Sequence, residues 1–273
     1  MNRKNILAVI GAVVLLAAAF FISYGISYKS NLAADKAPSS AQTTASAQAT
    51  APAAEPSGSQ DGETAAENEA TTAVNSLQAL PSPQTVEVPE EGWELTLINR
   101  YYKLSEYYEP HLDTAIEGSE VYLDSRVAEQ FRQMYAAAQA DGIDLTPFSG
   151  YVSFERQSRR FEDKTAEFMD EGYEKALAEV LASEYVMPAG CSEDNAGFSV
   201  CIGEEDEDFA NSDAYKWLKS YAAVYGFIER YPAAKEKSTH VKAQPWRWRY
   251  VGTDAKTMDL NELCLEEYLS KVN

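Results

Sequence analysis

An uncharged apolar segment close to the N-terminus limits most strongly how this chain can fold. Residues 6–26 read I-L-A-V-I-G-A-V-V-L-L-A-A-A-F-F-I-S-Y-G-I, and Arg3 and Lys4 precede them. A helix needs roughly 20 apolar residues to cross a bilayer, and this segment has no polar face that would suit a soluble core helix. We therefore predict a cytoplasmic N-terminus at 1–5 and a transmembrane signal anchor at 6–27. A cleaved signal peptide is the alternative.

The anchor predicts a single-pass cell-membrane protein whose C-terminal part is extracellular. Residues 28–91 are rich in Ala, Ser, Thr, Pro, Gln and Glu, and they contain few large apolar side chains. Such a segment cannot bury enough apolar surface to offset its ordering entropy, so we predict a disordered linker. Large apolar residues return at Trp93. The folded domain is thus predicted at 92–273, a length that suits one domain.

The composition excludes several functions for this domain. The chain has 23 Lys and Arg against 43 Asp and Glu, a formal net charge of −20. A nucleic-acid-binding protein needs a basic face for the phosphates, so we expect no nucleic-acid partner. Residues 1–90 contain 4 basic and 8 acidic residues, which leaves 19 basic and 35 acidic residues for the rest. Two histidines, and three cysteines without a C-x-x-C pair, also argue against a histidine-rich metal site or a zinc ribbon.

Hydrophobic spacing predicts an α+β fold with a small antiparallel sheet and flanking helices. Asp124 is expected to cap a helix that ends before Gly142, because apolar residues recur between them at helical spacing. Ser212 or Asp213 is expected to cap another helix. Further helices are predicted at 154–183, interrupted at Gly172, and at 260–272. Short strands are predicted at 145–152, 198–202, 227–230 and 246–251.

Six strings along the domain carry a family resemblance. They are D-S-R (124–126), S-G-Y-V-S-F-E-R-Q (149–157), P-A-G-C-S-E-D-N-A-G-F-S-V-C-I (188–202), Y-G-F-I-E-R-Y-P (225–232), Q-P-W-R-W-R-Y-V-G (244–252) and L-E-E-Y-L (265–269). In this order and spacing the chain resembles the zinc D-Ala-D-Ala carboxypeptidases of the VanY type, peptidase family M15. The resemblance implies an M15/VanY-like carboxypeptidase fold.

The resemblance also shows that the metal site is substituted. The family motif reads S-x-H-x-x-G-x-A-x-D and later E-P-W-H, in which two histidines and an aspartate hold Zn²⁺ and the glutamate takes a proton from water. This chain has Asp194, Cys201 and Arg247 at the ligand positions and Gln244 at the general-base position. A guanidinium has no lone pair to give, and an amide accepts no proton at neutral pH. We therefore expect no metal, no cofactor and no catalytic residue, although zinc serves the active relatives.

Other residues around the vacated site complete the prediction. The family's arginine within S-G-Y-R-S is Val152 here. We hypothesise that Arg247 forms an ion pair with Asp194 that replaces the metal as a cross-link; alternatively, Arg247 binds a peptide carboxylate. His240 is the only candidate for a substitute ligand, but we interpret both His240 and His111 as ordinary loop or surface residues.

The three cysteines offer a further cross-link, because disulfides persist outside the cell. We predict a disulfide between Cys191 and Cys201, which flank the former metal motif. A Cys201–Cys264 disulfide, or reduced thiols, are the alternatives.

The resemblance implies a groove with candidate residues Ser149, Tyr151, Gln157, Ser192, Glu193, Trp246 and Arg247. We predict a membrane-anchored extracellular domain that is catalytically inactive and binds a peptidoglycan stem peptide or a cell-envelope protein partner. One alternative is an active D-alanyl-D-alanine carboxypeptidase that remodels the cell wall with a non-standard metal site. The other is a structural interaction domain without a ligand groove.

Overall fold

The computed structural model describes residues 79–272. The predicted cytoplasmic N-terminus, the membrane anchor at 6–27 and the linker up to residue 78 lie outside the described residues. Within 79–272, none of the helices combines the length and the apolar character that crossing a membrane requires. The described residues form the α+β architecture that the sequence predicted, with a small antiparallel sheet and helices around it.

The main sheet has four strands in the order β5-β6-β8-β7, and every neighbouring pair is antiparallel. The strands are β5 (Pro147–Ser149), β6 (Ser199–Ile202), β7 (Phe227–Tyr231) and β8 (Gln244–Tyr250). All residues of β6 and β7 are buried. The central pair β6–β8 therefore offers a rigid base for side chains that extend from these two strands.

Helix α3 (Ser125–Ala140) begins and ends where the sequence predicts. The Asp124 carboxylate accepts a hydrogen bond from the Arg126 backbone N–H at 3.0 Å, which caps the first turn. Along the helix Val127, Phe131 and Met134 are fully buried. The Phe131 ring meets Phe227 of β7 edge-on, with ring centroids 6.2 Å apart. The apolar face of α3 thus packs against the sheet in the main core.

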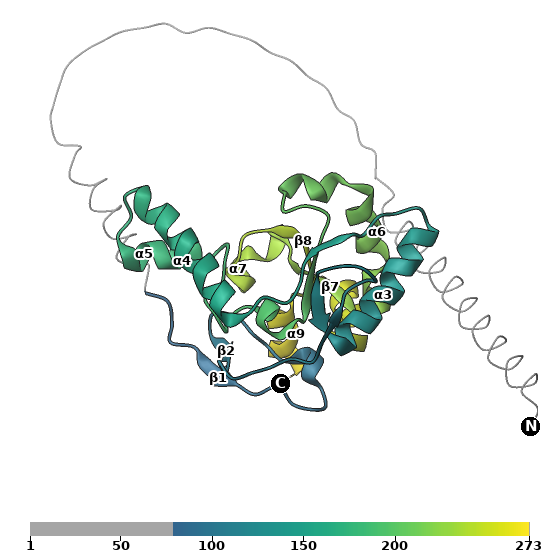
Figure 1. The fold of residues 1–273 in the computed structure, drawn as a ribbon, viewed down its shortest axis with the longest axis horizontal. Coiled ribbons are helices and arrows are strands. Elements are labelled where there is room, and N and C mark those ends of the chain that lie inside the picture. The colour runs from purple at the N-terminus through teal and green to yellow at the C-terminus, as the bar shows by residue number, and fades with distance from the viewer. Residues whose placement is uncertain (1–78, 273) are drawn as a thin grey trace, which may run out of the picture. The chain divides into compact units, whose positions relative to one another are not determined.

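The predicted long helix with a break is two helices, α4 (Phe154–Asp170) and α5 (Lys175–Ala182). Gly172 lies between them with a φ of 99°, a left-handed conformation that glycine adopts without a steric penalty. Ser153 caps α4 through a 3.3 Å bond from the Arg156 N–H. Figure 1 shows α4 and α5 side by side at one edge of the domain. Near the start of α4, Gln157 Nε2 donates to the Met187 backbone oxygen at 2.6 Å, so this end of the helix is close to the chain that leads into β6.

The C-terminal helix predicted at 260–272 is interrupted. Helix α8 (Ala255–Leu260) and helix α9 (Leu265–Val272) are separate, and Glu262 between them has a φ of 51°. Helix α6 (Asp213–Tyr221) is capped by Ser212, and α7 (Glu236–Thr239) precedes β8. The sequence did not signal the break before Leu265, because the apolar spacing continues across it.

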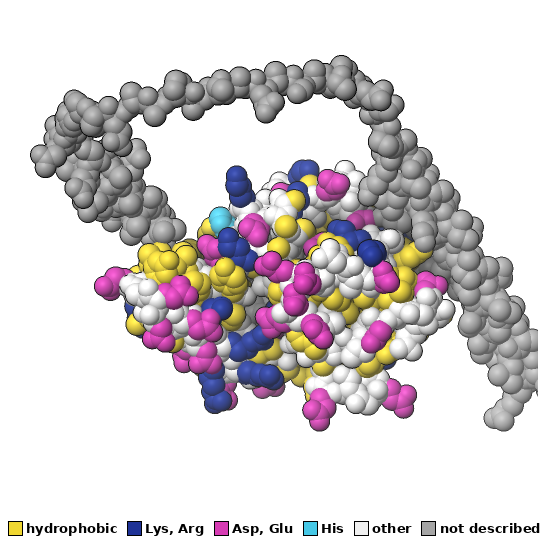
Figure 2. Space-filling view, turned by 90° about the horizontal axis from the view of Figure 1, so that it is seen from above, with side chains coloured by type: hydrophobic (Ala, Val, Ile, Leu, Met, Phe, Trp, Pro, Cys, Tyr) yellow, Lys and Arg dark blue, Asp and Glu magenta, His cyan; other side chains and the backbone are white. Residues whose placement is uncertain are grey.

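Two small sheets escaped prediction because each strand has only three residues. Strands β3 (Leu112–Thr114) and β4 (Tyr122–Asp124) pair antiparallel, and β1 (Gln84–Val86) pairs in parallel with β2 (Tyr102–Leu104). Strand β1 lies inside the segment 28–91, so ordered structure begins before the predicted boundary at residue 92. Its order comes from backbone pairing with β2, which composition does not reveal. Figure 2 shows acidic and basic side chains interspersed over one face of the domain.

Candidate functional site

The main sheet brings the four substituted positions together. Cys201 of β6 and Arg247 of β8 are direct register partners, and Gln244 begins β8. Asp194 lies in the short 3₁₀ helix Glu193–Ala196 that precedes β6, where Ser192 caps it by accepting a hydrogen bond from the Asp194 N–H at 3.3 Å. The positions predicted from the family motif therefore form one cluster, although they are up to 53 residues apart in the chain.

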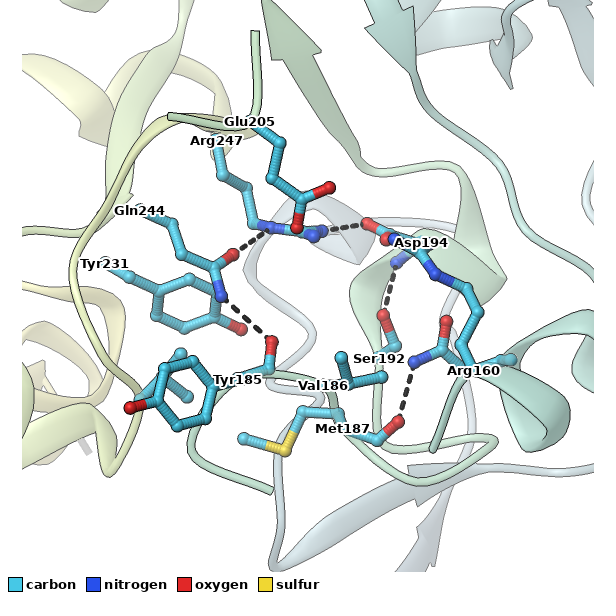
Figure 3. Close-up of a pocket in the computed structure, with 12 residues that line it drawn as sticks. Arg160, Tyr185, Val186, Met187, Ser192, Asp194, Glu205, Tyr231, Gln244 and Arg247 are labelled. Atoms are coloured by element: carbon cyan, nitrogen blue, oxygen red, sulfur yellow. Dashed lines mark hydrogen bonds and ion pairs between the residues drawn. The ribbon is translucent and has the colours of Figure 1, made fainter. Parts of the chain in front are cut away.

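An ion pair occupies the centre of this cluster. The Arg247 guanidinium pairs with the Asp194 carboxylate, and its Nε donates to Gln244 Oε1 at 2.7 Å. Gln244 in turn donates from Nε2 to the Tyr185 backbone oxygen at 3.0 Å. The Arg247 and Asp194 side chains are only 12 % and 3 % exposed. The predicted ion pair is thus present, and it connects the 3₁₀ turn before β6 to β8 (Figure 3).

The charges in the cluster stabilise one another. Burial alone lowers the pKa of Arg247, but the Asp194 carboxylate outweighs burial, so the pKa lies above its ordinary value. Burial raises the pKa of the Cys201 thiol to about 12, although Arg247 counteracts part of the increase. At neutral pH the guanidinium is therefore charged and the thiol is protonated.

These side chains do not fit a zinc ion. A zinc site needs lone pairs from deprotonated thiolates, neutral histidines or carboxylates, and Arg247 has none to give. The Asp194 carboxylate already pairs with Arg247, and the Gln244 amide oxygen already accepts from it. Across residues 79–272, no three His, Cys, Asp or Glu side chains lie close enough to hold a metal ion.

A small cavity lies beside the ion pair. It measures about 20 Å³, which is room for about one water molecule. Figure 3 shows Arg160 and Asp194 on one side of it and Gln244 and Tyr231 on the other. Its lining consists of Gln157, Arg160, Tyr185, Val186, Met187, Ser192, Asp194, Glu205, Tyr231, Val241, Gln244 and Arg247. Three of the predicted groove residues, Gln157, Ser192 and Arg247, therefore line this cavity.

Glu193, in contrast, was wrongly assigned to the groove. It is 2 % exposed and accepts hydrogen bonds from Arg230 Nε at 2.9 Å and from Ser199 Oγ at 3.0 Å. Arg249 Nε lies 3.3 Å from the same carboxylate, and Arg230 also forms a two-fold ion pair with Glu266 at 2.7 and 2.9 Å. Glu193 therefore belongs to a buried ionic network that holds the sheet to α9.

The other predicted groove residues lie elsewhere. Ser149 of β5 faces Cys201 across the sheet register, and the Tyr151 N–H donates to the Tyr122 oxygen at 2.7 Å; neither residue lines the cavity. Trp246 is 7 % exposed and lines a neighbouring hollow of about 530 Å³. This hollow shares Tyr185, Val186, Glu205 and Gln244 with the cavity and adds Lys164, Asp206, Glu207, Asp208, Lys242, Ala243 and Trp246.

Sequence reasoning missed Arg160, Tyr185 and Glu205. Arg160 could have been found, because it lies three residues after Gln157 and so on the same helix face. Tyr185 and Glu205 come from loops, and no spacing rule brings them to the site. The two histidines match their interpretation. His240 ends α7 and contacts the Tyr101 hydroxyl at 3.4 Å, and His111 is exposed before β3; neither lines the cavity.

The predicted Cys191–Cys201 disulfide does not form. All three cysteines are free and buried. Cys191 packs against Met187, Tyr231 and Val241, whereas Cys201 belongs to the main core on β6. The two thiols thus lie in separate apolar clusters. The family motif places them near each other in sequence, but a disulfide also requires the Cβ atoms to face each other.

Comparison with known proteins identifies relatives that share both sequence and fold. The family model for VanY, D-alanyl-D-alanine carboxypeptidase, matches residues 120–253. A D-alanyl-D-alanine carboxypeptidase of Enterococcus faecalis is 35 % identical over 182 residues, which are 66 % of this chain and 67 % of that protein.

Three solved structures give the same result. VanYB in complex with D-alanine-D-alanine superimposes with a TM-score of 0.59 at 34 % identity, over 66 % of this chain and 99 % of that one. A mutant VanY from the VanB-type resistance cassette was solved in complex with Zn(II). The LD-carboxypeptidase LdcB, whose structure concerns peptidoglycan recognition, gives a TM-score of 0.60 at 31 % identity, over 72 % of this chain and 94 % of that one.

Proposed function

The chain belongs to the VanY family of D-alanyl-D-alanine carboxypeptidases, and from this membership we propose that it binds a cell-envelope peptide without hydrolysing it. One observation carries the proposal: the Arg247 guanidinium pairs with Asp194 and Gln244 at the family's metal position. A protein cation thus takes the place of the metal cation, and the proton acceptor is replaced by an amide.

The chemistry of hydrolysis supports the inactive interpretation. A metallopeptidase needs an open ligand position that activates water and a base that removes the proton. Gln244 cannot act as the base, and its amide oxygen is already an acceptor for Arg247. The Cys201 thiol is buried and its pKa is raised to about 12, so it is protonated at neutral pH in the site as it stands. Because Arg247 is already bound to Asp194 and Gln244, we do not favour the alternative in which Arg247 itself binds a peptide carboxylate.

The inherited cavity supports a peptide ligand. Gln157 and Ser192 occupy positions that match the family pattern, and both line the cavity beside the ion pair. The relatives include one solved with D-alanine-D-alanine and one whose structure concerns peptidoglycan recognition. We therefore favour a peptidoglycan stem peptide over a protein partner. The membrane anchor at 6–27 would hold the domain on the extracellular side, where such peptides occur.

A metal analysis and an activity assay on the same purified full-length protein test this proposal. We expect less than about 0.1 zinc per chain after incubation with zinc and desalting, and no release of D-alanine from a synthetic pentapeptide that ends in D-Ala-D-Ala. The same pentapeptide should give a saturable signal in isothermal titration calorimetry. Stoichiometric zinc together with D-alanine release would overturn the proposal, and so would the absence of any peptide binding.

A further inference from the structure

The solvent-facing side of α4 carries its charges in two blocks of opposite sign. Arg156 and Arg159 lie in the first half of the helix, and Asp163, Glu167 and Asp170 lie in the second half. All five residues are exposed, and the Arg159 and Glu167 side chains are 69 % and 62 % exposed. With about 3.6 residues per turn, these five positions form one stripe along the helix, and the two buried residues of α4 face the domain on the other side.

This order of charges opposes the dipole of the helix. Acidic groups stabilise a helix near its N-terminus and basic groups near its C-terminus, because the N-terminal end carries partial positive charge. Helix α4 has no basic residue in its last turn, and Asp170 is its final residue. The stripe is therefore arranged against the stability of a single helix, which calls for a partner that compensates it.

Contacts within one copy neutralise only part of the stripe. Arg159 pairs with Glu155, and Glu167 pairs with Lys164. Three side chains form no ion pair and no hydrogen bond with any residue of 79–272, namely those of Arg156, Asp163 and Asp170. The stripe thus presents free charges of both signs to solvent.

The spacing of the stripe suits the packing of two helices. Positions 156, 159, 163, 166 and 170 are alternately three and four residues apart, which is the repeat along which paired helices contact each other. The small residue Ala166 occupies one of these positions and is exposed. It allows a second helix to approach closely at that point.

We propose that two copies of this chain associate through α4, with the two helices antiparallel about a two-fold axis at the level of residue 161. In this register Arg159 faces Asp163 of the partner subunit, and Arg156 faces Glu167 of the partner subunit. The two-fold symmetry repeats both ion pairs. Asp170 then lies near the positive N-terminal end of the partner's helix, and the two helix dipoles run in opposite directions.

A second copy fits this surface better than a ligand of a single charge. A polyanion would be attracted by the arginines and repelled by the acidic half, and a polycation would meet the reverse. Only a partner with the same two blocks in opposite order matches both halves. Helix α4 also lies at one edge of the domain, where a second copy can reach it (Figure 1).

The association is electrostatic and short-ranged. Residues 91–273 contain 19 basic and 35 acidic residues, so two domains repel each other at long range and attract only where the stripes meet. Exposed ion pairs contribute little individually, so we expect a weak dimer that dissociates as the ionic strength rises.

Cysteine cross-linking of the full-length protein in detergent tests the register. One chain carries Arg159→Cys, a second chain with a different tag carries Asp163→Cys, and the three native cysteines are buried. After mild oxidation of the mixture, we expect disulfides between unlike chains to be at least fivefold more abundant than between like chains. Chains with Asp213→Cys and Lys216→Cys, an exposed pair on α6, are the matched control and should cross-link only at background level.

Charge reversal tests the ion pairs, with self-association measured by analytical ultracentrifugation of the full-length protein. Arg159→Glu and Asp163→Lys should each weaken the dimer at least fivefold, because each places like charges opposite one another. The double variant should restore it, since the exchanged charges again face opposite ones. Lys216→Glu, on the exposed face of α6, should leave the dimer unchanged.

Each result decides a separate part of the proposal. Equal cross-linking of like and unlike chains would overturn the antiparallel register. A double variant as weak as the single variants, or a dimer that is insensitive to salt, would overturn the ion pairs. A chain that stays monomeric and gives no cross-link would overturn the association as a whole. Peptide binding is measured independently, so none of these outcomes affects the proposed function.

Discussion

Removing Arg247 should destabilise the domain through the carboxylate that is left behind. In Arg247→Met, Asp194 keeps its buried position, with 3 % of its side chain exposed, but loses its counter-ion. Breaking a buried ion pair on one side costs roughly 3–5 kcal/mol, and Arg247 is slightly exposed, so we expect about 3 kcal/mol. For a folded part of this length that corresponds to a decrease in Tm of about 6–12 °C.

A double-mutant cycle separates the pair from the individual residues. Asp194→Asn should also destabilise, whereas Asp194→Asn combined with Arg247→Met should cost less than the sum of the single variants by about 2 kcal/mol. The free energy of unfolding is measured by urea denaturation followed by tryptophan fluorescence. The exposed pair of Lys216 and Asp213, with side chains 66 % and 83 % exposed, is the control.

For that control pair we expect a coupling of about 0–1 kcal/mol, as is typical of surface ion pairs. A coupling between Asp194 and Arg247 that is no larger than the control would refute the idea that this ion pair has replaced the metal as a cross-link. A loss below about 0.5 kcal/mol in Arg247→Met would refute it as well.

Three further predictions follow from the same contacts. A variant with the family residues restored combines Asp194→His, Cys201→Asp, Gln244→Glu and Arg247→His. It should retain about one zinc per molecule after desalting, measured by mass spectrometry. The three buried thiols, whose pKa values are raised to about 11 or 12 by burial, should not react with a thiol reagent at pH 8 until urea is added; fast labelling of the native protein would contradict their burial. Burial acts to raise the pKa of Glu266, but the charge of Arg230 outweighs burial, so the pKa is lowered in the folded protein. The stability that the Glu266 carboxylate contributes is therefore complete above its unfolded pKa of about 4.3 and is lost as the pH falls through the lower folded pKa. Glu266→Gln should therefore flatten the acid limb of a stability–pH curve, and an unchanged acid limb would contradict this assignment.

Local signals in the sequence predicted the helices well. The Asp124 cap and the apolar spacing after it define α3, and Gly172 marks the break between α4 and α5. Each of these signals acts within a few residues, so a single sequence contains it completely. The family motif extended the prediction over long range, because it identified Asp194 and Arg247 as neighbours although 53 residues separate them.

Errors arose where residues depend on partners far along the chain. Glu193 was assigned to the groove because it matches a position of the family pattern, yet its carboxylate points into a network with Arg230 and Arg249. Alternate residues of a short turn can face opposite sides, and only the positions of the arginines decide which side holds the charge. For the same reason, the sequence does not reveal how the Cys191 and Cys201 side chains are oriented.

The two ionic centres of the domain have different consequences for evolution and function. The network of Glu193, Arg230 and Glu266 is enclosed, with Arg230 fully buried, so it stabilises the fold and offers no group to a ligand. The pair of Asp194 and Arg247 borders a cavity, and its two charges neutralise each other. In the proposed function, this ion pair preserves the wall of the cavity at the family's metal position and leaves no means to activate water. In the proposed function, the domain keeps a peptide in place and has no chemical step with which to release it as a shorter product.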